Sequence, residues 1–355
     1  MALASPFRPP TVGLDIGSSA VKAVALKKLR SGWSLVAAGE MPLPEGSVTE
    51  GGALEPEMVS GAVGQLFDSI HLRRARVAAA LSGHAVIVKR LSMPGMTDAE
   101  LGEAIPWEAE QYIPFDLSEV QLDYQIIGRP NDESRTGLDV LLVAAKKDKI
   151  ADRSDLINRT GRRPVVLDVE AFALANAYQA NYPDRQDPLS ALIHIGRRMT
   201  IVCLLEHGEP IFTRDISIGG QVHLDALLRE LGPLGVDEMG AKRILHGQFP
   251  PDIDADQVAA VLRDASGQVV NEVRKTVDFY RATAPVEKLS RIVVSGGAWQ
   301  AVGLVDQFAS EFAAPVDVFD PFRKITRPSR AIGADLAGPA YAVAVGLAMR
   351  DEGDR

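Results

Sequence analysis

One short segment of the chain gathers several groups that can bind phosphate. In Leu14–Lys22, which reads LDIGSSAVK, an apolar run ends in an acidic residue, a glycine turn with two serines, and a lysine. A tight turn after a strand points several backbone N–H groups in one direction, and glycine lets a phosphate approach closely. A carboxylate there can hold a hydrated Mg²⁺, and a lysine can reach a phosphate oxygen. We therefore predict a phosphate site at Asp15, Gly17, Ser18, Ser19 and Lys22, with Asp15 as the metal-binding residue.

The same pattern occurs again half a chain later. Ile193–Thr200 reads IHIGRRMT and aligns with the first segment, so that His194 stands where Asp15 stands. Each copy reads as strand, glycine turn and strand, followed by a third strand. Two related halves that begin with the same hairpin predict a duplicated α/β architecture with a cleft between the halves. Gly196 and Arg197 are the second set of predicted phosphate ligands.

A third glycine motif follows the apolar strand Arg291–Val294. The sequence Ser-Gly-Gly-Ala there leaves room for an adenine ring against the backbone, with N–H groups near a phosphate. Gly296, Gly297 and Ala298 are the predicted nucleotide-binding residues of this motif. A plain turn between a strand and a helix remains the alternative when the motif is considered alone.

Strands and helices alternate along the chain around these motifs. Thr97, with Glu100 three residues later, predicts a capped helix that runs toward Tyr112. The polar segment from Tyr182 to Pro188 predicts a boundary between two domains. The other expected strands are Thr11–Ile16, Ala20–Leu26, Trp33–Met41, Arg76–Leu81, Ala85–Leu91, Leu122–Ile127, Asp139–Ala145, Pro164–Val169, Ala191–Ile195, Thr200–Glu206 and Pro210–Ile216. The other expected helices are Glu57–Ile70, Asp148–Arg159, Ala171–Ala180, Val222–Leu231, Asp237–Leu245, Ala255–Ala282 and Ala340–Arg350.

The composition narrows the function classes. The 355 residues include 38 basic and 47 acidic side chains, a formal net charge of −9, which argues against nucleic acid as the main partner. The single cysteine, Cys203, excludes intramolecular disulfides and a zinc site built from cysteines. No apolar stretch approaches about 18 residues, so we expect no membrane span and a cytoplasmic location.

Four segments together resemble the phosphate, adenosine and closing-helix motifs of actin-like ATPases. They are Leu14–Lys22, Gly196–Thr200, Val294–Ala298 and Val343–Ala348. This resemblance implies a duplicated, two-lobed actin-like (ribonuclease H-like) α/β fold. It also implies that ATP or ADP with Mg²⁺ binds in the cleft between the lobes.

A finer resemblance covers nearly the whole chain, from Thr11 to Met349. Trp107–Phe115 (WEAEQYIPF), Leu122–Gln125, Val166–Asn176 and Phe212–Gly220 are similar to the PilM family of type IV pilus assembly proteins. The resemblance implies a small α/β insertion, termed 1C or SHS2-like, at residues 85–159. The first lobe, termed 1A, would then comprise residues 1–84, 160–188 and 335–355, and the second lobe residues 189–334.

The family resemblance also implies partners. PilM-like proteins hold the cytoplasmic N-terminal tail of the membrane protein PilN in a groove between 1A and 1C. They act as a cytoplasmic ring component at the inner face of the inner membrane, together with other pilus assembly proteins. For this chain it implies a nucleotide-binding scaffold without direct membrane insertion. The expected groove residues are Leu101, Ile105, Trp107 and Ile113; a role in the core remains the alternative for each.

The sequence departs from the actin-like pattern in its second half. His194 replaces the usual aspartate, and a neutral imidazole is a poor ligand for Mg²⁺. Arg197 and Arg198 replace small residues, so they would either neutralise phosphate charge or fill the cleft. Where the family offers a glutamate to the ribose, this chain has a glycine, which leaves three possible nucleotide ligands nearby: Glu238, Lys242 and Arg243. These departures predict weak or absent hydrolysis.

Two other functions remain open. One is a true ATPase or kinase of the same fold, which an aspartate at position 194 would favour. The other is an FtsA-like cell-division protein or a type II secretion protein. FtsA-like proteins usually end in a basic amphipathic helix, whereas the last six residues here, RDEGDR, are polar and of mixed charge, so we expect no direct membrane anchor.

Overall fold

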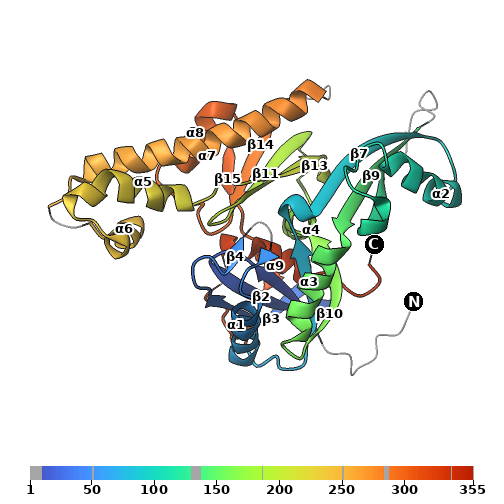
Figure 1. Ribbon diagram of the computed structural model, residues 1–355, viewed down its shortest axis with the longest axis horizontal. Coiled ribbons are helices and arrows are strands. Elements are labelled where there is room, and N and C mark those ends of the chain that lie inside the picture. The colour runs from blue at the N-terminus through green and yellow to red at the C-terminus, as the bar shows by residue number, and fades with distance from the viewer. Residues whose placement is uncertain are drawn as a thin grey trace.

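The computed structural model describes residues 10–49, 52–128, 137–185, 187–249, 252–283, 288–336 and 338–354. Two large mixed β-sheets form two lobes, and a smaller sheet forms a module beside the first lobe (Figure 1). Alternating strands and helices fold into these layers as the sequence predicts.

The first sheet carries the N-terminal hairpin. Its strand order is β10-β6-β1-β2-β3-β16. The bounds are β1 Thr11–Ile16, β2 Ala20–Leu29, β3 Gly32–Pro42, β6 Arg76–Leu81, β10 Arg163–Val169 and β16 Ile325–Thr326. Strands β1, β2 and β3 form an antiparallel meander, while β6 runs parallel to β1. Helix α1, Pro56–Ser69, buries its apolar stripe against this sheet, and β4 (Val48–Thr49) and β5 (Gly52–Ala53) form a short hairpin above it.

The second sheet repeats the same topology. Its order is β13-β12-β11-β14-β15, so β14-β11-β12-β13 corresponds to β6-β1-β2-β3. The bounds are β11 Leu189–Ile195, β12 Thr200–Glu206, β13 Glu209–Ile216, β14 Arg291–Ser295 and β15 Val316–Val318. Both hairpins close with the same bond: Gly17 N–H donates to the Ala20 carbonyl at 3.1 Å, and Gly196 N–H to the Met199 carbonyl at 2.9 Å. The predicted duplication is therefore confirmed at the level of topology.

Two helices connect the lobes. Helices α4 (Glu170–Asn181) and α9 (Ala342–Ala348) lie between the large sheets, in one apolar core with residues of both (Figure 1). They cross so closely that a Cβ at Gly346 would lie 1.7 Å from the Ala173 carbonyl oxygen. This crossing explains the small residues of the closing helix, which is shorter than the predicted 340–350 range.

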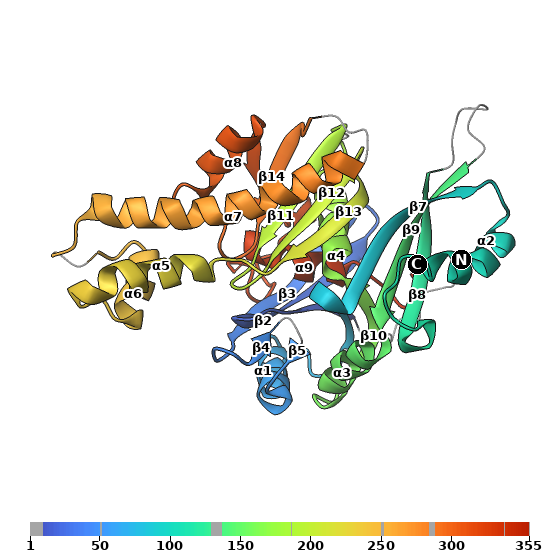
Figure 2. The same cartoon turned by 45° about the horizontal axis from the view of Figure 1, so that its top comes forward.

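The inserted module has a core of its own. Strands β7 (Val86–Pro94), β9 (Gly137–Lys146) and β8 (Val120–Gly128) pair antiparallel in that order, and helix α2 (Asp98–Ala109) covers them (Figure 2). The capping box of Thr97 and Glu100 is present, as predicted. Helix α3 (Lys147–Asn158) leads back to the first lobe. The predicted domain boundaries themselves stay a prediction.

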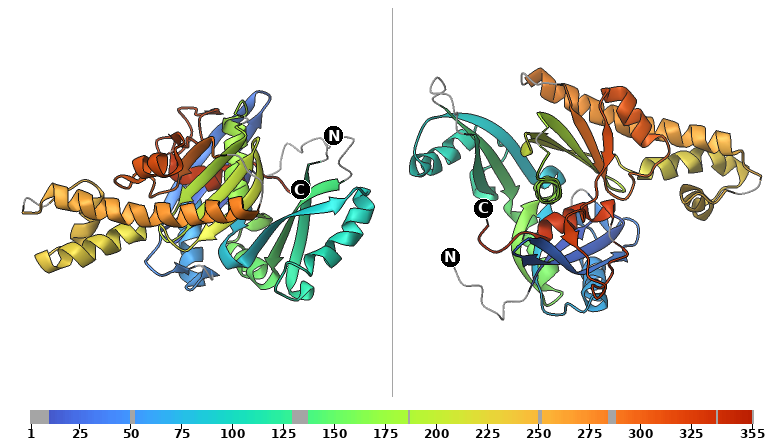
Figure 3. Two further views of the ribbon diagram at one scale, coloured as in Figure 1. Left: turned by 90° about the horizontal axis from the view of Figure 1, so that it is seen from above. Right: turned by 180° about the vertical axis from the view of Figure 1, so that it is seen from behind.

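The second lobe carries a helical arm that points away from the module (Figure 3). It is built from α5 (Gln221–Leu231), α6 (Glu238–Leu245) and α7 (Ala255–Thr283), which share an apolar cluster. Helix α8 (Leu304–Phe312) packs on α7 and on the sheet. Helix α8 and the short strands β4, β5, β15 and β16 were not predicted from the sequence.

Candidate functional site

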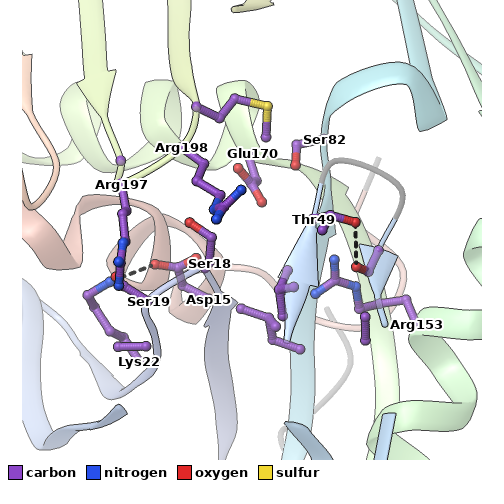
Figure 4. Close-up of a pocket in the computed structure, with 18 of the residues that line it drawn as sticks. Asp15, Ser18, Ser19, Lys22, Thr49, Ser82, Arg153, Glu170, Arg197 and Arg198 are labelled. Carbon is purple, nitrogen blue, oxygen red and sulfur yellow. Dashed lines mark hydrogen bonds and ion pairs between the residues drawn. The ribbon is translucent and has the colours of Figure 1, made fainter. Parts of the chain in front are cut away.

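A cavity of about 840 Å³ lies between the two glycine turns (Figure 4). Its wall includes most of the residues that the sequence predicts for nucleotide binding. These are Asp15, Gly17, Ser18, Ser19, Lys22, Gly196, Arg197 and Gly297. The fold thus brings motifs from both halves of the chain to one cavity, because equivalent hairpins face each other across it.

The end of β1 supplies a buried carboxylate with a cationic partner. Asp15 and Lys22 are register partners on β1 and β2, and the Lys22 Nζ lies 3.5 Å from Asp15 Oδ2. Both side chains are largely buried, so the lysine offsets the cost of burying the carboxylate. The pair leaves one negative and one positive group at the base of the cavity.

The equivalent position in the second lobe is neutral. His194 is buried, and its Nδ1 lies 3.0 Å from the Ser295 hydroxyl on the neighbouring strand β14. Burial lowers the pKa of His194 to about 4, although Asp15 acts in the opposite direction. The imidazole is therefore uncharged at neutral pH, and the sequence-based alternative of a protonated His194 paired with a phosphate does not apply there.

The residues of the Ser-Gly-Gly-Ala loop either hold the loop against β11 or line the cavity. Gly296 has φ +94°, and a Cβ there would lie 2.2 Å from the Ile195 carbonyl oxygen. The Ala298 N–H donates to that carbonyl at 3.1 Å. Gly296 and Ala298 thus hold the loop against β11, whereas Gly297 lines the cavity.

Two arginines extend from the β11–β12 turn into the cavity. The turn is held by the start of α5, since Gly220 N–H donates to the Gly196 carbonyl at 2.9 Å and Gln221 N–H to the Arg197 carbonyl at 2.7 Å. Figure 4 shows Arg197 and Arg198 reaching from the second lobe toward the serines of the first turn. Both arginines also contact Glu45 of the first lobe.

Two charged residues of the cavity were not among the predicted site residues. Glu170 begins α4, directly after β10, and Arg153 lies on α3 and lines the same cavity (Figure 4). Burial, together with Asp15 and Asp215, raises the pKa of Glu170 to about 8, while Arg153 opposes the shift. A signal for Glu170 was present, because β10, β6 and β1 are parallel and their carboxyl ends meet at one edge.

The three possible ligands on α6 lie outside the lining of this cavity, although His246, just after the helix, is part of it. Glu238 and Lys242 form an ion pair with each other, and this pair lowers the pKa of Glu238, with a smaller effect from Arg197. A role for Glu238, Lys242 or Arg243 in nucleotide binding stays a prediction.

The four predicted groove residues differ in their exposure. Leu101, Ile105 and Ile113 are buried in the core of the module, the role that the sequence left open as the alternative. Trp107 on α2 is 74% exposed.

The junction of module and first lobe also holds a buried polar pair. Asp168 on β10 lies 3.4 Å from Arg350, which follows α9. The Asp168 Oδ2 and the Arg350 Nε are buried, and neither makes a hydrogen bond. Burial raises the pKa of Asp168, Arg350 opposes this, and Asp123 on β8 adds to it.

Across the described ranges, no helix combines the length and the apolar character needed to cross a membrane. The same ranges contain no group of three or more His, Cys, Asp or Glu side chains arranged to hold a metal ion.

Comparison with known proteins identifies related sequences and structures. The family described as type IV pilus assembly protein PilM matches residues 13–352. The chain is also similar to a chain of a solved PilM-PilN type IV pilus biogenesis complex, with 26% identity and a TM-score of 0.81, over 97% of this chain and 98% of that chain.

More distant structures share the fold. The ethanolamine utilization protein EutJ from Carboxydothermus hydrogenoformans has 16% identity and a TM-score of 0.56, over 97% of this chain and 91% of that chain. MreB 5 of Spiroplasma citri, bound to AMPPNP, has 14% identity and a TM-score of 0.53, over 96% of this chain and 95% of that chain. These matches confirm the predicted actin-like fold class.

Proposed function

Since this chain belongs to the PilM family of type IV pilus assembly proteins, we propose that it is a nucleotide-binding scaffold of the pilus assembly complex. Its cleft would bind ATP or ADP, and the junction of its first lobe and module would bind the tail of a PilN-like membrane protein. Such a scaffold acts on the cytoplasmic side of the inner membrane, next to other pilus assembly proteins and further copies of itself. The observation that carries the nucleotide proposal is the cavity that both glycine turns line.

The lining of the cavity suits a nucleotide. Its volume of about 840 Å³ falls in the range of small-molecule pockets, roughly 300 to 1,000 Å³. Lys22, Arg197 and Arg198 place positive charge near both turns, where the phosphates would lie. Asp15 would hold a hydrated Mg²⁺ together with phosphate oxygens, since Mg²⁺ in nucleotide sites usually binds through one or two carboxylates and the substrate phosphates. Mg²⁺ would neutralise phosphate charge there.

We expect hydrolysis to be weak or absent. Asp15 lies on one side of the cavity, but its counterpart His194 is uncharged and hydrogen-bonded to Ser295. A neutral imidazole would neither attract a second cation nor help to place Mg²⁺. Nucleotide would then regulate the scaffold by binding.

One observation favours the second candidate, an active ATPase. Glu170 lies in the cavity beside Asp15 with its pKa raised to about 8, close to physiological pH, which suits a general base. Phosphate release by the wild type and by Glu170→Gln separates the two candidates. An ATPase would release phosphate and lose this activity in the variant, whereas the scaffold releases little in either form.

The junction of module and first lobe offers two strand edges to an extended tail. Strand β10 ends the first sheet and β8 ends the module sheet among the described residues. An edge strand can pair with an added peptide strand through backbone hydrogen bonds. The Arg350 side chain, which is 21% exposed beside Asp168, would give such a tail a charged donor. The similarity of this chain to a chain of the solved PilM-PilN complex supports this choice of partner.

The test of nucleotide binding is the thermal unfolding midpoint with and without millimolar MgATP. A ligand at 100 times its Kd stabilises a protein by about 2.7 kcal/mol, which raises the midpoint measurably. We expect this rise in the wild type and its loss in Asp15→Ala, with an unchanged circular dichroism spectrum.

Asp155→Ala is the matched control, because it removes a carboxylate from another part of the same cavity wall. The unfolding midpoint of Asp155→Ala should still rise with MgATP. No rise in the wild type would contradict nucleotide binding, and an equal rise in Asp15→Ala would remove Asp15 from the site.

A further inference from the structure

A single carboxylate of the first lobe contacts both arginines of the second. Glu45 follows β3, and its Oε2 lies 3.0 Å from Arg197 Nη2, while its Oε1 lies 3.4 Å from Arg198 Nη2. The two arginines belong to the β11–β12 turn and line the cavity, so these ion pairs connect the two lobes beside it.

Arg197 is held in place but is incompletely bonded. Its carbonyl accepts from α5, and its Nε donates to Gln221 Oε1 at 2.7 Å. Its Nη2 is buried and makes no hydrogen bond of good geometry, even with Glu45 at ion-pair distance. A buried guanidinium N–H without a hydrogen bond is costly, so this donor favours a better-placed oxyanion.

Arg198 is the more accessible of the pair. Its side chain is 42% exposed, and Figure 4 shows it pointing toward Ser18 in the cavity. Glu45 is 43% exposed, and ion pairs between exposed groups contribute little stability. The contacts of Glu45 can therefore be exchanged at small cost.

Phosphate and carboxylate offer arginine the same kind of acceptor. Both present two oxygens that can accept parallel N–H bonds from one guanidinium, and phosphate carries the greater charge. A polyphosphate between the two glycine turns would approach Arg197 and Arg198 from the side of Ser18. It would then compete with Glu45 for the same donors.

We propose that Arg197 and Arg198 form a polyphosphate-binding pair that Glu45 occupies until the ligand displaces it. Glu45 is then an internal competitor that lowers the affinity for nucleotide and connects the two lobes. Phosphate binding breaks this connection. This inference rests on the proposed nucleotide-binding function and adds to it the residues that regulate binding.

Isothermal titration of the full chain with MgATP and with tripolyphosphate tests the competition. Removing the carboxylate in Glu45→Gln should tighten binding of both ligands by roughly 2- to 5-fold, in line with the strength of exposed ion pairs. Tripolyphosphate is included because it has the phosphates without the base.

Glu57→Gln is the matched control. It also removes one carboxylate of the first lobe that is paired with an arginine at the cavity wall, Arg159, at 2.7 Å, but this pair does not cross to the second lobe. Its affinity for both ligands should equal that of the wild type.

A double variant tests whether the gain acts through Arg198. The tightening caused by Glu45→Gln should be smaller in the Arg198→Gln background, because the effects of substitutions at two interacting residues are not additive. Unchanged affinity in Glu45→Gln, beside a wild type that binds MgATP, overturns this inference alone. Absence of binding in every variant overturns both this inference and the nucleotide proposal. Binding by Glu45→Gln with none by the wild type supports the competition most strongly.

Discussion

Asp15 and His194 occupy equivalent positions in the two halves but differ in chemistry. Asp15 is paired with Lys22 and faces the cavity as an anion, whereas His194 is bonded to Ser295 and uncharged. The cleft is therefore asymmetric at the level of single residues. One wall presents a carboxylate paired with a lysine, and the other presents a neutral ring and two arginines.

The neutral state of His194 predicts a pH dependence of stability. Its pKa is about 4 in the folded protein and about 6.5 in the unfolded chain, so between these values only the unfolded chain binds the proton. The free energy of unfolding should therefore fall as the pH is lowered through this window. From pH 6.5 to pH 5, His194 accounts for a loss of about 2 kcal/mol.

The matched variant is His194→Asn, which keeps a hydrogen-bonding side chain next to Ser295 but does not titrate. Its free energy of unfolding, measured by urea denaturation from pH 7 to pH 5, should decrease less than that of the wild type. Some decrease remains, because burial also lowers the pKa of His223. Parallel curves for the two proteins would show that His194 is not buried as a neutral group.

At the scale of elements, the crossing of α4 and α9 determines how the lobes are joined. Both helices belong to one core with strands of both sheets. The contact between the two helices depends on the absence of a side chain at Gly346, because the backbone of α4 lies directly against this residue of α9. Small residues in α9 are therefore a packing requirement of the two-lobed architecture.

Gly346→Ala should destabilise the protein strongly. The added Cβ would lie 1.7 Å from the Ala173 carbonyl oxygen, so the two helices must separate. We expect a loss of about 3 kcal/mol or more, at the upper end of overpacking effects, measured by urea denaturation.

Gly61→Ala in α1 is the control substitution. It is exposed, and an added Cβ there meets no other atom within 4 Å. This change should instead stabilise the protein by roughly 0.5 to 1 kcal/mol, because alanine favours helix more than glycine does. Equal effects at the two positions would contradict the described crossing.

At the scale of the whole molecule, two proposed binding regions are close along one strand. Strand β10 carries Asp168 at the junction with the module, and Glu170 follows it in the cavity. The exposed Trp107 lies on the module and the helical arm extends the other way (Figure 3). The nucleotide region and the tail region thus use different elements around a shared strand end.

This arrangement predicts that the two ligands can be separated by mutation. Arg350→Ala should lower the affinity for a synthetic peptide of a PilN-like N-terminal tail by roughly tenfold, the effect of losing one hydrogen bond to a charged group. The MgATP-dependent rise in the unfolding midpoint should stay unchanged. Fluorescence anisotropy of the labelled peptide measures the first quantity.

Arg163→Ala is the control for this experiment. Arg163 binds Glu352 at 2.7 Å near the same C-terminal segment, but it is exposed. It should leave both affinities unchanged. If Arg350→Ala reduced peptide and nucleotide binding together, the two regions would not be separable.

The local architecture could be predicted from the sequence because its causes are local. Apolar periodicity located nearly all the long elements, several within one or two residues of their observed bounds, such as Thr11–Ile16 and Thr200–Glu206. The repeated glycine hairpin predicted the duplicated topology, and Thr97 with Glu100 predicted a helix start. Short strands such as β15 and β16 were missed because two or three residues carry no periodic signal.

The sequence by itself therefore determined most of the elements, the duplication, the family and the glycine motifs that line the cavity. Only the tertiary structure decided which apolar residues of the module are core, that Glu170 enters the cavity, and that Glu45 meets Arg197 and Arg198. Glu45 and Arg198 are 153 positions apart in the chain. Hydrogen bonding and apolar patterning act between near neighbours and leave a trace in the sequence. Contacts across the cleft depend on how two lobes pack, which no local pattern encodes.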